Sequence, residues 1–246
     1  MVGLFTGPAG DRRSFLDRLV TTLVPSHSGT ASAYESAMRQ RNRLLEEDAD
    51  PRWLSALEAE MAAHAAALHF ARADAVTHLE AMIEAGAPDP AFPAAAVALT
   101  PLFEDRHEPA GSLDLEAELR SLWAGSRALD RAAGRTVQGP HRVDFDVHYA
   151  QKQMPAALGS TGEQKALLVG LILAHARLVA ARTGITPFLL LDEIAAHLDP
   201  DRRAALFAAL DALGAQCLMT GTDPMLFDAL GDRAQRVTVR DGRLNA

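Results

Sequence analysis

The stretch Ser160-Thr161-Gly162-Glu163-Gln164-Lys165 decides the fold when it is taken together with the run Pro187-Phe188-Leu189-Leu190-Leu191-Asp192-Glu193. The first stretch opens an apolar helical run, and the second is an apolar, strand-like run that ends in two carboxylates. Gly162 and Asp192 lie 30 residues apart. Either motif alone is a weak signal, but their order and spacing predict an α/β protein that handles phosphate groups.

Asp192 and Glu193 follow a run that is apolar without interruption, which is typical of a buried strand in a parallel sheet. Such strands deliver side chains to the carboxyl edge of the sheet, where α/β proteins bind their ligands. We expect Asp192 to hold Mg²⁺, usually through water, and Glu193 to polarise a water molecule that attacks a phosphate. The alternative is an ordinary strand end whose acids are merely solvated.

Ser160 and Glu163 also have two possible roles. Ser-x-x-Glu is a capping box, in which each side chain accepts a hydrogen bond from the backbone of the other residue at the start of a helix. A serine hydroxyl, an unhindered Gly162 and the free amides of a helix N-terminus also form a good receptor for phosphate. The sequence leaves both interpretations open.

The bulk composition indicates a globular protein that works inside the cell. The chain has 246 residues, of which 48% are hydrophobic, and a single cysteine, Cys217, excludes a disulfide framework and fits a reducing cytosol. There is no signal-like N-terminus, and no apolar run is expected to cross a membrane, so we expect a cytoplasmic location. A net charge of −8 argues against a global basic surface for nucleic acid.

Helical spacing of apolar residues dominates the first half of the chain. Asp11 is expected to cap the first helix, and Asp50 followed by Pro51 is a strong start for the third. The third helix would be about 50 Å long at 1.5 Å per residue, which suggests a projecting arm on which the fourth could pack. The expected helices cover residues 12–23, 30–46, 51–85 and 113–133.

The remaining sequence alternates between strand and helix patterns, which predicts an α/β fold with a mainly parallel, buried sheet and an inserted helical arm lobe. After a first strand within residues 94–103, the expected strands cover residues 143–149, 188–191, 216–219 and 236–239. The expected helices cover residues 160–182 and 201–213, and a short helix starts at Pro224.

Two more positions fit a nucleotide site shared between two subunits. Asp199 lies seven residues after Asp192, in the segment His197-Leu198-Asp199, and fits a loop that crosses between subunits. Thr222 lies in the segment Thr220-Gly221-Thr222-Asp223 after a strand, where a sensor of the γ-phosphate is expected.

These motifs together resemble those of ABC-type ATPases, in the branch related to the SMC proteins. Further stretches narrow the resemblance to the RecF family of bacterial recombination mediator proteins. The resemblance extends over nearly the whole chain, but it is weak between Trp53 and Trp123. These stretches are Phe5-Thr6-Gly7, Asp11 to Arg18, Tyr34 to Leu45, Gly139-Pro140-His141-Arg142, Leu191-Asp192-Glu193 and Thr220 to Pro224.

The resemblance implies an ATP- and Mg²⁺-dependent DNA-binding protein that aids recombinase loading at single-strand gaps and supports replication restart and the SOS response. It also implies a homodimer that forms with ATP, and work with the mediator proteins RecR and RecO. In such a dimer, the signature of one subunit (Ser160, Thr161, Gly162, Glu163 and Gln164) closes on the nucleotide of the other. Asp192 and catalytic Glu193 serve the subunit's own nucleotide, with Asp199 in the D-loop and Thr222 at the switch.

The arginine clusters are candidates for contact with DNA phosphates, and their alternative role is that of solvated helix faces. The candidates are Arg12, Arg13, Arg39, Arg41 and Arg43. The role of the segment Gly139-Pro140-His141-Arg142 is left open, and a turn or structural role for His141 is favoured over catalysis.

The main departure from the family pattern is that Gly-x-x-x-x-Gly-Lys-Ser/Thr, which cradles nucleotide phosphates, does not occur in the 246 residues. We therefore expect a C-terminal portion of a longer protein, inactive as an ATPase alone. The expected division is residues 1–46 continuing from an absent ATPase lobe, 47–134 as the helical arm and 135–246 as the ATPase portion. The alternative is a non-catalytic interaction or dimerisation module.

Overall fold

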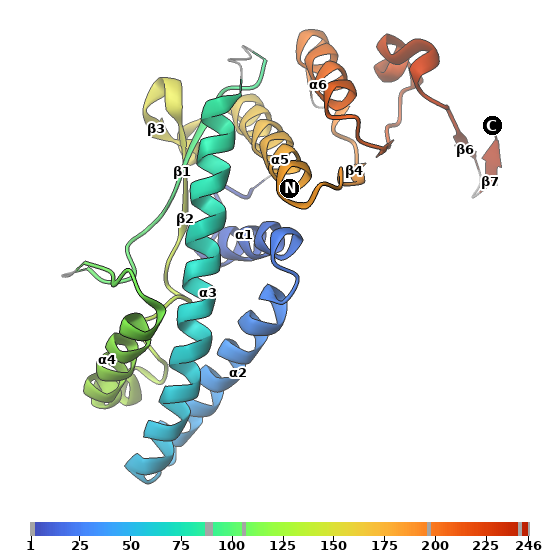
Figure 1. Ribbon diagram of the computed structural model, residues 1–246. Coiled ribbons are helices and arrows are strands. Elements are labelled where there is room, and N and C mark those ends of the chain that lie inside the picture. The colour runs from blue at the N-terminus through green and yellow to red at the C-terminus, as the bar shows by residue number, and fades with distance from the viewer. Residues whose placement is uncertain (1–2, 87–90, 105–106, 196–197, 241–242, 246) are drawn as a thin grey trace.

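A long helix, α3 (Pro51–Ala85), is the axis around which the other elements pack (Figure 1). The computed structural model describes residues 3–86, 91–104, 107–195, 198–240 and 243–245. Asp50 is the N-cap of α3, its Oδ1 accepts a hydrogen bond of 2.8 Å from the amide of Arg52, and Pro51 is the first helical residue. The predicted start and length of this helix are therefore confirmed.

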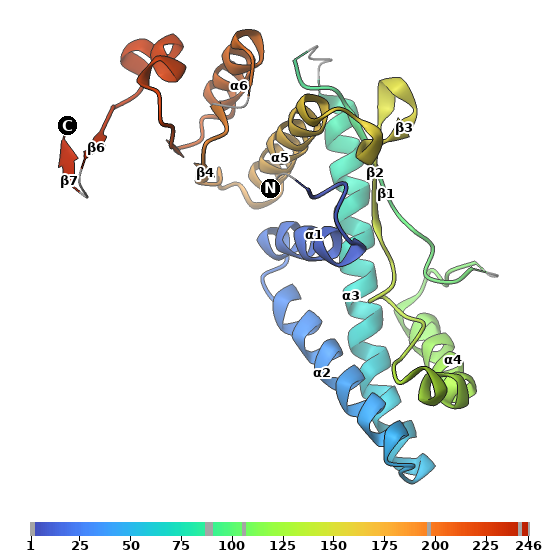
Figure 2. The same cartoon turned by 180° about the vertical axis from the view of Figure 1, so that it is seen from behind.

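The arm consists of α2 (His27–Glu46) along one side of α3 and α4 (Ser112–Ala133) along another (Figures 1 and 2). Its core contains Tyr34, Met61 and Trp123, and small alanines of α3 let the helices approach closely. The predicted packing of α4 on α3 is confirmed, but α2 begins three residues earlier than expected. Because α2 and α3 share one core, packing is continuous across residue 46, and the division at that point stays a prediction.

A second core lies at the other end of α3, where α1 (Ala9–Leu23) and a three-stranded antiparallel sheet meet. The strands are β1 (Ala95–Leu99), β2 (Phe145–Tyr149) and β3 (Met154–Pro155). The short helix η1 (Ala150–Lys152) joins β2 to β3, and η2 (Ala156–Leu158) follows β3. Val97 pairs with Val147, and the alternation predicted along β2 places Phe145 and Val147 in the core. The predicted capping role of Asp11 is wrong, because Pro8 is the N-cap and Asp11 lies inside the first turn.

Helix α5 (Thr161–Thr183) connects this core to the C-terminal part of the chain. By length and composition alone, this helix is long and apolar enough to cross a membrane. The expectation that the chain has no such apolar run is therefore wrong. However, 61% of its most apolar window is buried within the structure, as in the core helix of a globular protein. One set of its side chains packs against α1 and α3, and another set packs against α6 (Pro200–Leu213).

The C-terminal part contains β4 (Leu189–Leu191) and β5 (Cys217–Met219), followed by η4 (Pro224–Arg233), β6 (Thr238–Arg240) and β7 (Arg243–Asn245). The α/β fold class is confirmed, and β4 and β5 form the expected parallel pair, with Leu191 opposite Met219. The other pairs found among the described strands, β1–β2, β2–β3 and β6–β7, are antiparallel.

The prediction that β4 is a buried strand is wrong, because only one face of the β4–β5 pair is covered. Leu189 and Leu191 pack toward the core that α5 and α6 form. Leu190 and Leu218 point the other way and are 69% and 57% exposed. An uninterrupted apolar run is typical of strands with both faces covered, so one covering layer is missing from this face in the described structure.

Candidate functional site

The N-terminus of α5 is capped as the Ser-x-x-Glu pattern predicts. The Ser160 hydroxyl accepts a hydrogen bond of 3.4 Å from the Glu163 amide, and the Glu163 carboxylate accepts one of 2.8 Å from the Ser160 amide. A second interaction fixes the loop before the helix, since the Gln164 amide group donates to the carbonyls of Ala157 and Gly159, at 3.1 and 2.9 Å. The capping box is therefore formed, and Gln164 is used in holding its approach.

Glu163 is committed to structure on both of its oxygens. One oxygen accepts from the Ser160 amide, and the other forms an ion pair with Lys152. The Lys152 ammonium and then the Ser160 amide lower the pKa of Glu163 to about 2, so its carboxylate is ionised at neutral pH. The negative charge of Glu163 in the first turn also suits the positive end of the helix dipole.

The groups left open at this helix end are those a phosphate would use. Ser160, Thr161 and Gly162 are exposed, and within the described structure the amides of Thr161 and Gly162 meet no hydrogen-bond acceptor. Such free amides at a helix N-terminus form an anion receptor. A Cβ atom on Gly162 would lie 3.7 Å from the Arg202 guanidinium, which adds a positive charge beside the receptor.

The two acidic residues that follow β4 are bonded to a threonine that follows β5, one through its carboxylate and the other through its backbone amide. The Thr220 hydroxyl donates to Asp192 Oδ1 at 2.6 Å and accepts from the Glu193 amide at 3.1 Å. The Thr220 amide in turn donates to the Leu191 carbonyl at 3.0 Å, which extends the parallel pairing by one residue. Glu193 has a φ of 55°, a conformation that non-glycine residues rarely adopt and that turns the chain sharply after the strand.

Sequence reasoning named Thr222 in this segment and missed the role of Thr220. The role depends on the pairing of β4 with β5, because Thr220 directly follows β5 and therefore lies beside the residue that directly follows β4. Thr222 is exposed two residues further on, and its role as a switch stays a prediction. Gly221 between them is tightly placed, since a Cβ atom there would lie 2.8 Å from the Phe227 ring.

Asp199 is the N-cap of α6, where its Oδ1 accepts a hydrogen bond of 2.9 Å from the Arg202 amide. Pro200 is the first helical residue, so this is the same start signal that Asp50 and Pro51 give to α3. The D-loop role of Asp199 stays a prediction beside this capping role. His197, which precedes it in the segment, lies outside the described residues.

The two halves of the predicted site are separate in this chain. In the described part of the chain, Ser160 to Gln164 and the pair Asp192 and Glu193 share no hydrogen bond or ion pair. Nor do the described residues contain a cluster of three or more His, Cys, Asp or Glu side chains that could hold a metal. Asp192 with Thr220 still fits Mg²⁺, because this ion is bound through one or two carboxylates, water and substrate phosphates.

The prediction that Arg41 contacts DNA is wrong in this structure. Arg41 is fully buried in the arm, where its guanidinium donates to Glu58, Asp130, Thr136 and the Trp123 carbonyl at 2.7 to 2.9 Å. A side chain without exposed surface cannot meet a DNA phosphate.

Arg12 is partly exposed and paired, because two of its nitrogens donate to the Asp144 carboxylate at 3.0 and 2.6 Å, and its contact with DNA stays a prediction. Arg13, Arg39 and Arg43 remain available: Arg13 is half-buried, and Arg39 and Arg43 are exposed on α2.

The segment Gly139-Pro140-His141-Arg142 is a turn that locks the base of the arm. His141 donates from Nε2 to the Thr136 carbonyl at 3.0 Å and accepts at Nδ1 from the Tyr34 hydroxyl at 2.7 Å. Burial lowers the pKa of His141 to about 4, so the ring is neutral near pH 7. Gly139 has a φ of 138°, and a Cβ atom there would lie 2.9 Å from the Tyr34 hydroxyl. The structural role favoured for His141 fits these contacts.

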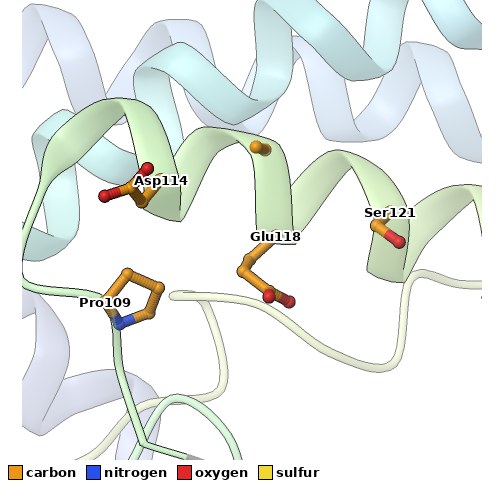
Figure 3. A pocket seen from close by; sticks show the side chains of 5 residues that line it. Pro109, Asp114, Glu118 and Ser121 are labelled. Carbon is orange, nitrogen blue, oxygen red and sulfur yellow. The ribbon is translucent and has the colours of Figure 1, made fainter.

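Two hollows lie outside this predicted site. One, of about 410 Å³, is on α4, where Asp114 and Glu118 face Pro109, and it is shown in Figure 3. Its two carboxylates make it unsuited to an anion. The other, of about 240 Å³, lies where α1, α2 and α3 meet the 139–142 turn, and it is lined by arginines.

The capped α5 terminus, the carboxylates after β4 and the helical arm give this chain the fold of a C-terminal portion of an ABC-type ATPase. No family model matches the chain. It is 54% identical over 246 residues to the DNA replication and repair protein RecF of Allorhizobium ampelinum, covering 100% of this chain and 66% of that protein. It is also 54% identical over 245 residues to the RecF proteins of Rhizobium etli and Brucella abortus, covering 99% of this chain and 65% and 64% of theirs. The chain belongs to the RecF family and spans just under two thirds of the length of these relatives.

Solved structures agree in fold. The chain matches the recombination mediator protein RecF-ATP in the RecFOR pathway with a TM-score of 0.78, covering 99% of this chain and 64% of that one. A second structure, of RecF-ATPrS in the same pathway, gives a TM-score of 0.77, with 99% and 65% covered. Sequence identity is 19% in both cases.

Proposed function

We propose that this chain supplies the signature and the hydrolytic carboxylates of an ATP-dependent DNA clamp that acts in recombinational repair and replication restart. The observation that carries the proposal is a pair of sites with free binding groups. The first is the capped N-terminus of α5, with its open amides, and the second is Asp192 and Glu193, both hydrogen-bonded to Thr220. The membership in the RecF family supports the same function.

The α5 N-terminus and the carboxylates after β4 have complementary roles in this proposal. Ser160 and Gly162 receive the γ-phosphate of a nucleotide that the partner subunit holds, because a helix N-terminus favours negative charge. Asp192 holds one side of a hydrated Mg²⁺, which neutralises phosphate charge when it is bound. Glu193 accepts a proton from the attacking water. The Thr220 hydroxyl fixes the Asp192 carboxylate and the Glu193 backbone amide relative to each other.

The uncovered face of β4 and β5 supports a further part of the proposal. Phe188, Leu190 and Leu218 expose apolar side chains on this part of the chain. A parallel sheet is stable with layers on both faces. We propose that an ATPase segment carrying the phosphate-binding loop packs against this face. The same face favours the second candidate function, in which the chain is a non-catalytic module that binds or dimerises through it.

DNA, RecR and RecO are the proposed partners, in the cytoplasm, and the ATP-bound form is proposed to be a homodimer. Both solved RecF structures are described as structures of a protein in the RecFOR pathway. For DNA contact, the remaining candidates on α2 are Arg39 and Arg43, which are 68% and 78% exposed. Contacts between arginines and phosphates give affinity that falls steeply with salt and depends little on sequence.

The test compares this chain with a chimera that joins to its start the segment of the Allorhizobium ampelinum relative that the chain does not cover. Mg²⁺-dependent ATP hydrolysis and ATP-dependent dimerisation are measured for both, by phosphate release and light scattering. We expect activity from the chimera and none from the chain alone. Glu193→Gln should abolish hydrolysis in the chimera and preserve dimerisation, whereas Ser160→Arg should abolish both.

The outcomes separate the two candidate functions. A chimera that dimerises but hydrolyses nothing, with or without Glu193, would favour the non-catalytic module. Saturable hydrolysis by the chain alone, lost on Glu193→Gln, would contradict the proposed need for a second segment. Replacing Arg39 and Arg43 with glutamine should weaken DNA retention and its salt dependence, with Arg120→Gln on the exposed face of α4 as the control.

A further inference from the structure

The hollow at the base of the arm is built from parts of the chain that the proposed ATPase site does not use. It has a volume of about 240 Å³ and is lined by residues of α1, α2 and α3 and by His141. Figure 2 shows where α1 crosses α3. Its lining includes Arg13 of α1, Tyr34 and Arg39 of α2, Arg72 of α3, and His141 of the 139–142 turn. We name it the Arg13 pocket.

The floor of the Arg13 pocket is fixed, and its polar groups are already satisfied. Arg72 donates to both oxygens of Asp17, at 2.8 and 2.7 Å, and to the Pro140 carbonyl at 2.8 Å. Asp17 also bonds to His27 at 2.8 Å. Tyr34 is held by His141, as described above. These groups can shape the pocket, but they have little hydrogen-bonding capacity left for a ligand.

Arg13 differs from every group of the floor. It is half-buried, and it forms no hydrogen bond or ion pair with any residue that the structure describes. Burial lowers the pKa of Arg13, and the nearby guanidiniums of Arg72 and Arg142 lower it further, although arginine stays charged at any physiological pH. A half-buried charge without a counter-charge is costly, and a bound anion would remove that cost.

The surplus of positive charge here is unusual for this chain, which has 32 acidic and 24 basic residues. The two carboxylates that attract Arg13 are both engaged elsewhere: Asp17 with Arg72 and His27, and Asp144 with Arg12. On the α2 side, Arg39 has only Glu35, at 3.6 Å on the surface. Glu35 also lines the pocket, but among the described residues no carboxylate forms an ion pair or a hydrogen bond with Arg13.

We propose that the Arg13 pocket binds a phosphate group, with Arg13 as the main contact and Arg39 as the second. The donors that remain free at the pocket are guanidinium groups, which match a ligand that only accepts hydrogen bonds. A phosphate offers oxygens in several directions to arginines from different helices, whereas a carboxylate offers two oxygens in one plane. The phosphate can come from a DNA backbone or be free in solution. The DNA source rests on the proposed function, and the free source does not.

The first arm of the test measures phosphate binding directly. The full chain is titrated with inorganic phosphate by calorimetry, at constant ionic strength set with chloride. We expect Arg13→Gln to weaken binding at least tenfold, Arg39→Gln to weaken it less, and Arg13→Lys to restore part of it. Arg18→Gln is the matched control, because Arg18 is an exposed arginine of the same helix that does not line the pocket. Urea unfolding of each variant establishes that it is folded.

The pocket assignment would be overturned by no phosphate binding by the unchanged chain, by equal binding by Arg13→Gln, or by an affinity for acetate as high as for phosphate. The last would assign the pocket to carboxylates of an acidic peptide. Equal losses in Arg13→Gln and Arg18→Gln would reduce the effect to net charge and overturn it as well.

The second arm distinguishes the sources of the phosphate. Affinity for a gapped DNA duplex is measured between 50 and 200 mM salt, and loss of one phosphate contact lowers the salt slope by about 0.9. We expect that decrease for Arg13→Gln and none for Arg18→Gln. Loss of phosphate binding with an unchanged DNA slope would support the receptor and assign it to free phosphate. Phosphate binding by a chain that binds no DNA would contradict the proposed DNA function and leave the pocket supported.

Discussion

The interior of the arm and the carboxyl edge of β4–β5 use the same chemical groups in opposite ways. In the arm, Glu58 and Asp130 are fully buried, and both are paired: Arg41 bonds to both, and Arg127 bonds to Glu58. At the edge, Asp192 is exposed, and the Thr220 hydroxyl donates a hydrogen bond to it.

The difference teaches where free chemical capacity lies in this chain. Removing a charge from water costs several kcal/mol, so a buried carboxylate survives only when its oxygens are all compensated. An exposed carboxylate keeps water on its free lone pairs and can exchange that water for a metal or a substrate. The arm therefore uses its charges for specificity of packing, while the edge keeps its charges available for ligands.

Replacing Arg41 with methionine should have the largest effect. The change leaves Asp130 without its arginine in the core and Glu58 with Arg127 alone, and breaking a buried pair in this way costs about 3–5 kcal/mol. The measurement is the free energy of unfolding in urea. Arg43→Gln, two residues along the same helix, is the control and should leave the free energy of unfolding almost unchanged, because its pair with Glu47 is exposed. Equal costs for the two variants would contradict the contrast between interior and surface.

Asp17 lies between the two extremes, with 24% of its side chain exposed. Burial raises the pKa of Asp17, but hydrogen bonds from His27 and Arg72 outweigh this and lower it to about 2, from 3.8. Because the folded pKa is depressed, the stabilisation is present above pH 4 and is lost as the pH falls from 4 to 2. The shift corresponds to about 2 kcal/mol.

Replacing Asp17 with asparagine should therefore cost at least about 2 kcal/mol at pH 7 and flatten the loss of stability between pH 4 and pH 2. The measurement is urea unfolding across that range. A variant that loses stability as steeply as the unchanged chain over this window would assign the acid sensitivity to other carboxylates.

The parts of the fold that the sequence predicts are those with local causes. Asp50 before Pro51, and Ser160 three residues before Glu163, act within one helical turn, so the starts of α3 and α5 are predicted correctly. The failure at Arg41 has a nonlocal cause, because its partner Asp130 is 89 residues away. A signal did exist: Arg41 lies seven residues after Tyr34 and four before Leu45, on the buried stripe of α2.

The candidate site shows the same limit. The motifs placed Asp192 and Glu193 at the end of a strand because apolar runs and their polar ends are local. Exposure of Leu190 could not be predicted, since it depends on which elements cover the sheet. The role of Thr220 required the register of β4 and β5, which only the paired strands define.

Replacing Ser160 with alanine should have a moderate effect on folding. The hydroxyl caps an exposed helix end, and loss of such a cap costs about 1 kcal/mol. Ser160→Asp, which can also accept from the Glu163 amide, should restore most of the stability. In the ATPase chimera, however, a carboxylate at this position should repel a phosphate, so stability and ATP-dependent dimerisation should separate. Loss of both together in Ser160→Asp would assign the residue a structural role alone.

The smallest effect on stability is expected from Thr220→Val. The same substitution at Thr136, in the arm, allows a direct comparison of the two regions. Thr136 is buried, where its hydroxyl accepts from Arg41 at 2.9 Å and donates to Asn42 at 2.8 Å. Its removal leaves buried partners unsatisfied and should cost about 1–3 kcal/mol. Thr220 donates to an exposed carboxylate that water can solvate instead, so its loss should cost less than about 1 kcal/mol. Urea unfolding of both variants measures the difference, and a Thr220→Val cost equal to that of Thr136→Val would show that the edge is as tightly compensated as the arm. In the chimera, Thr220→Val should still reduce ATP hydrolysis, because Asp192 and the Glu193 backbone lose the group that aligns them.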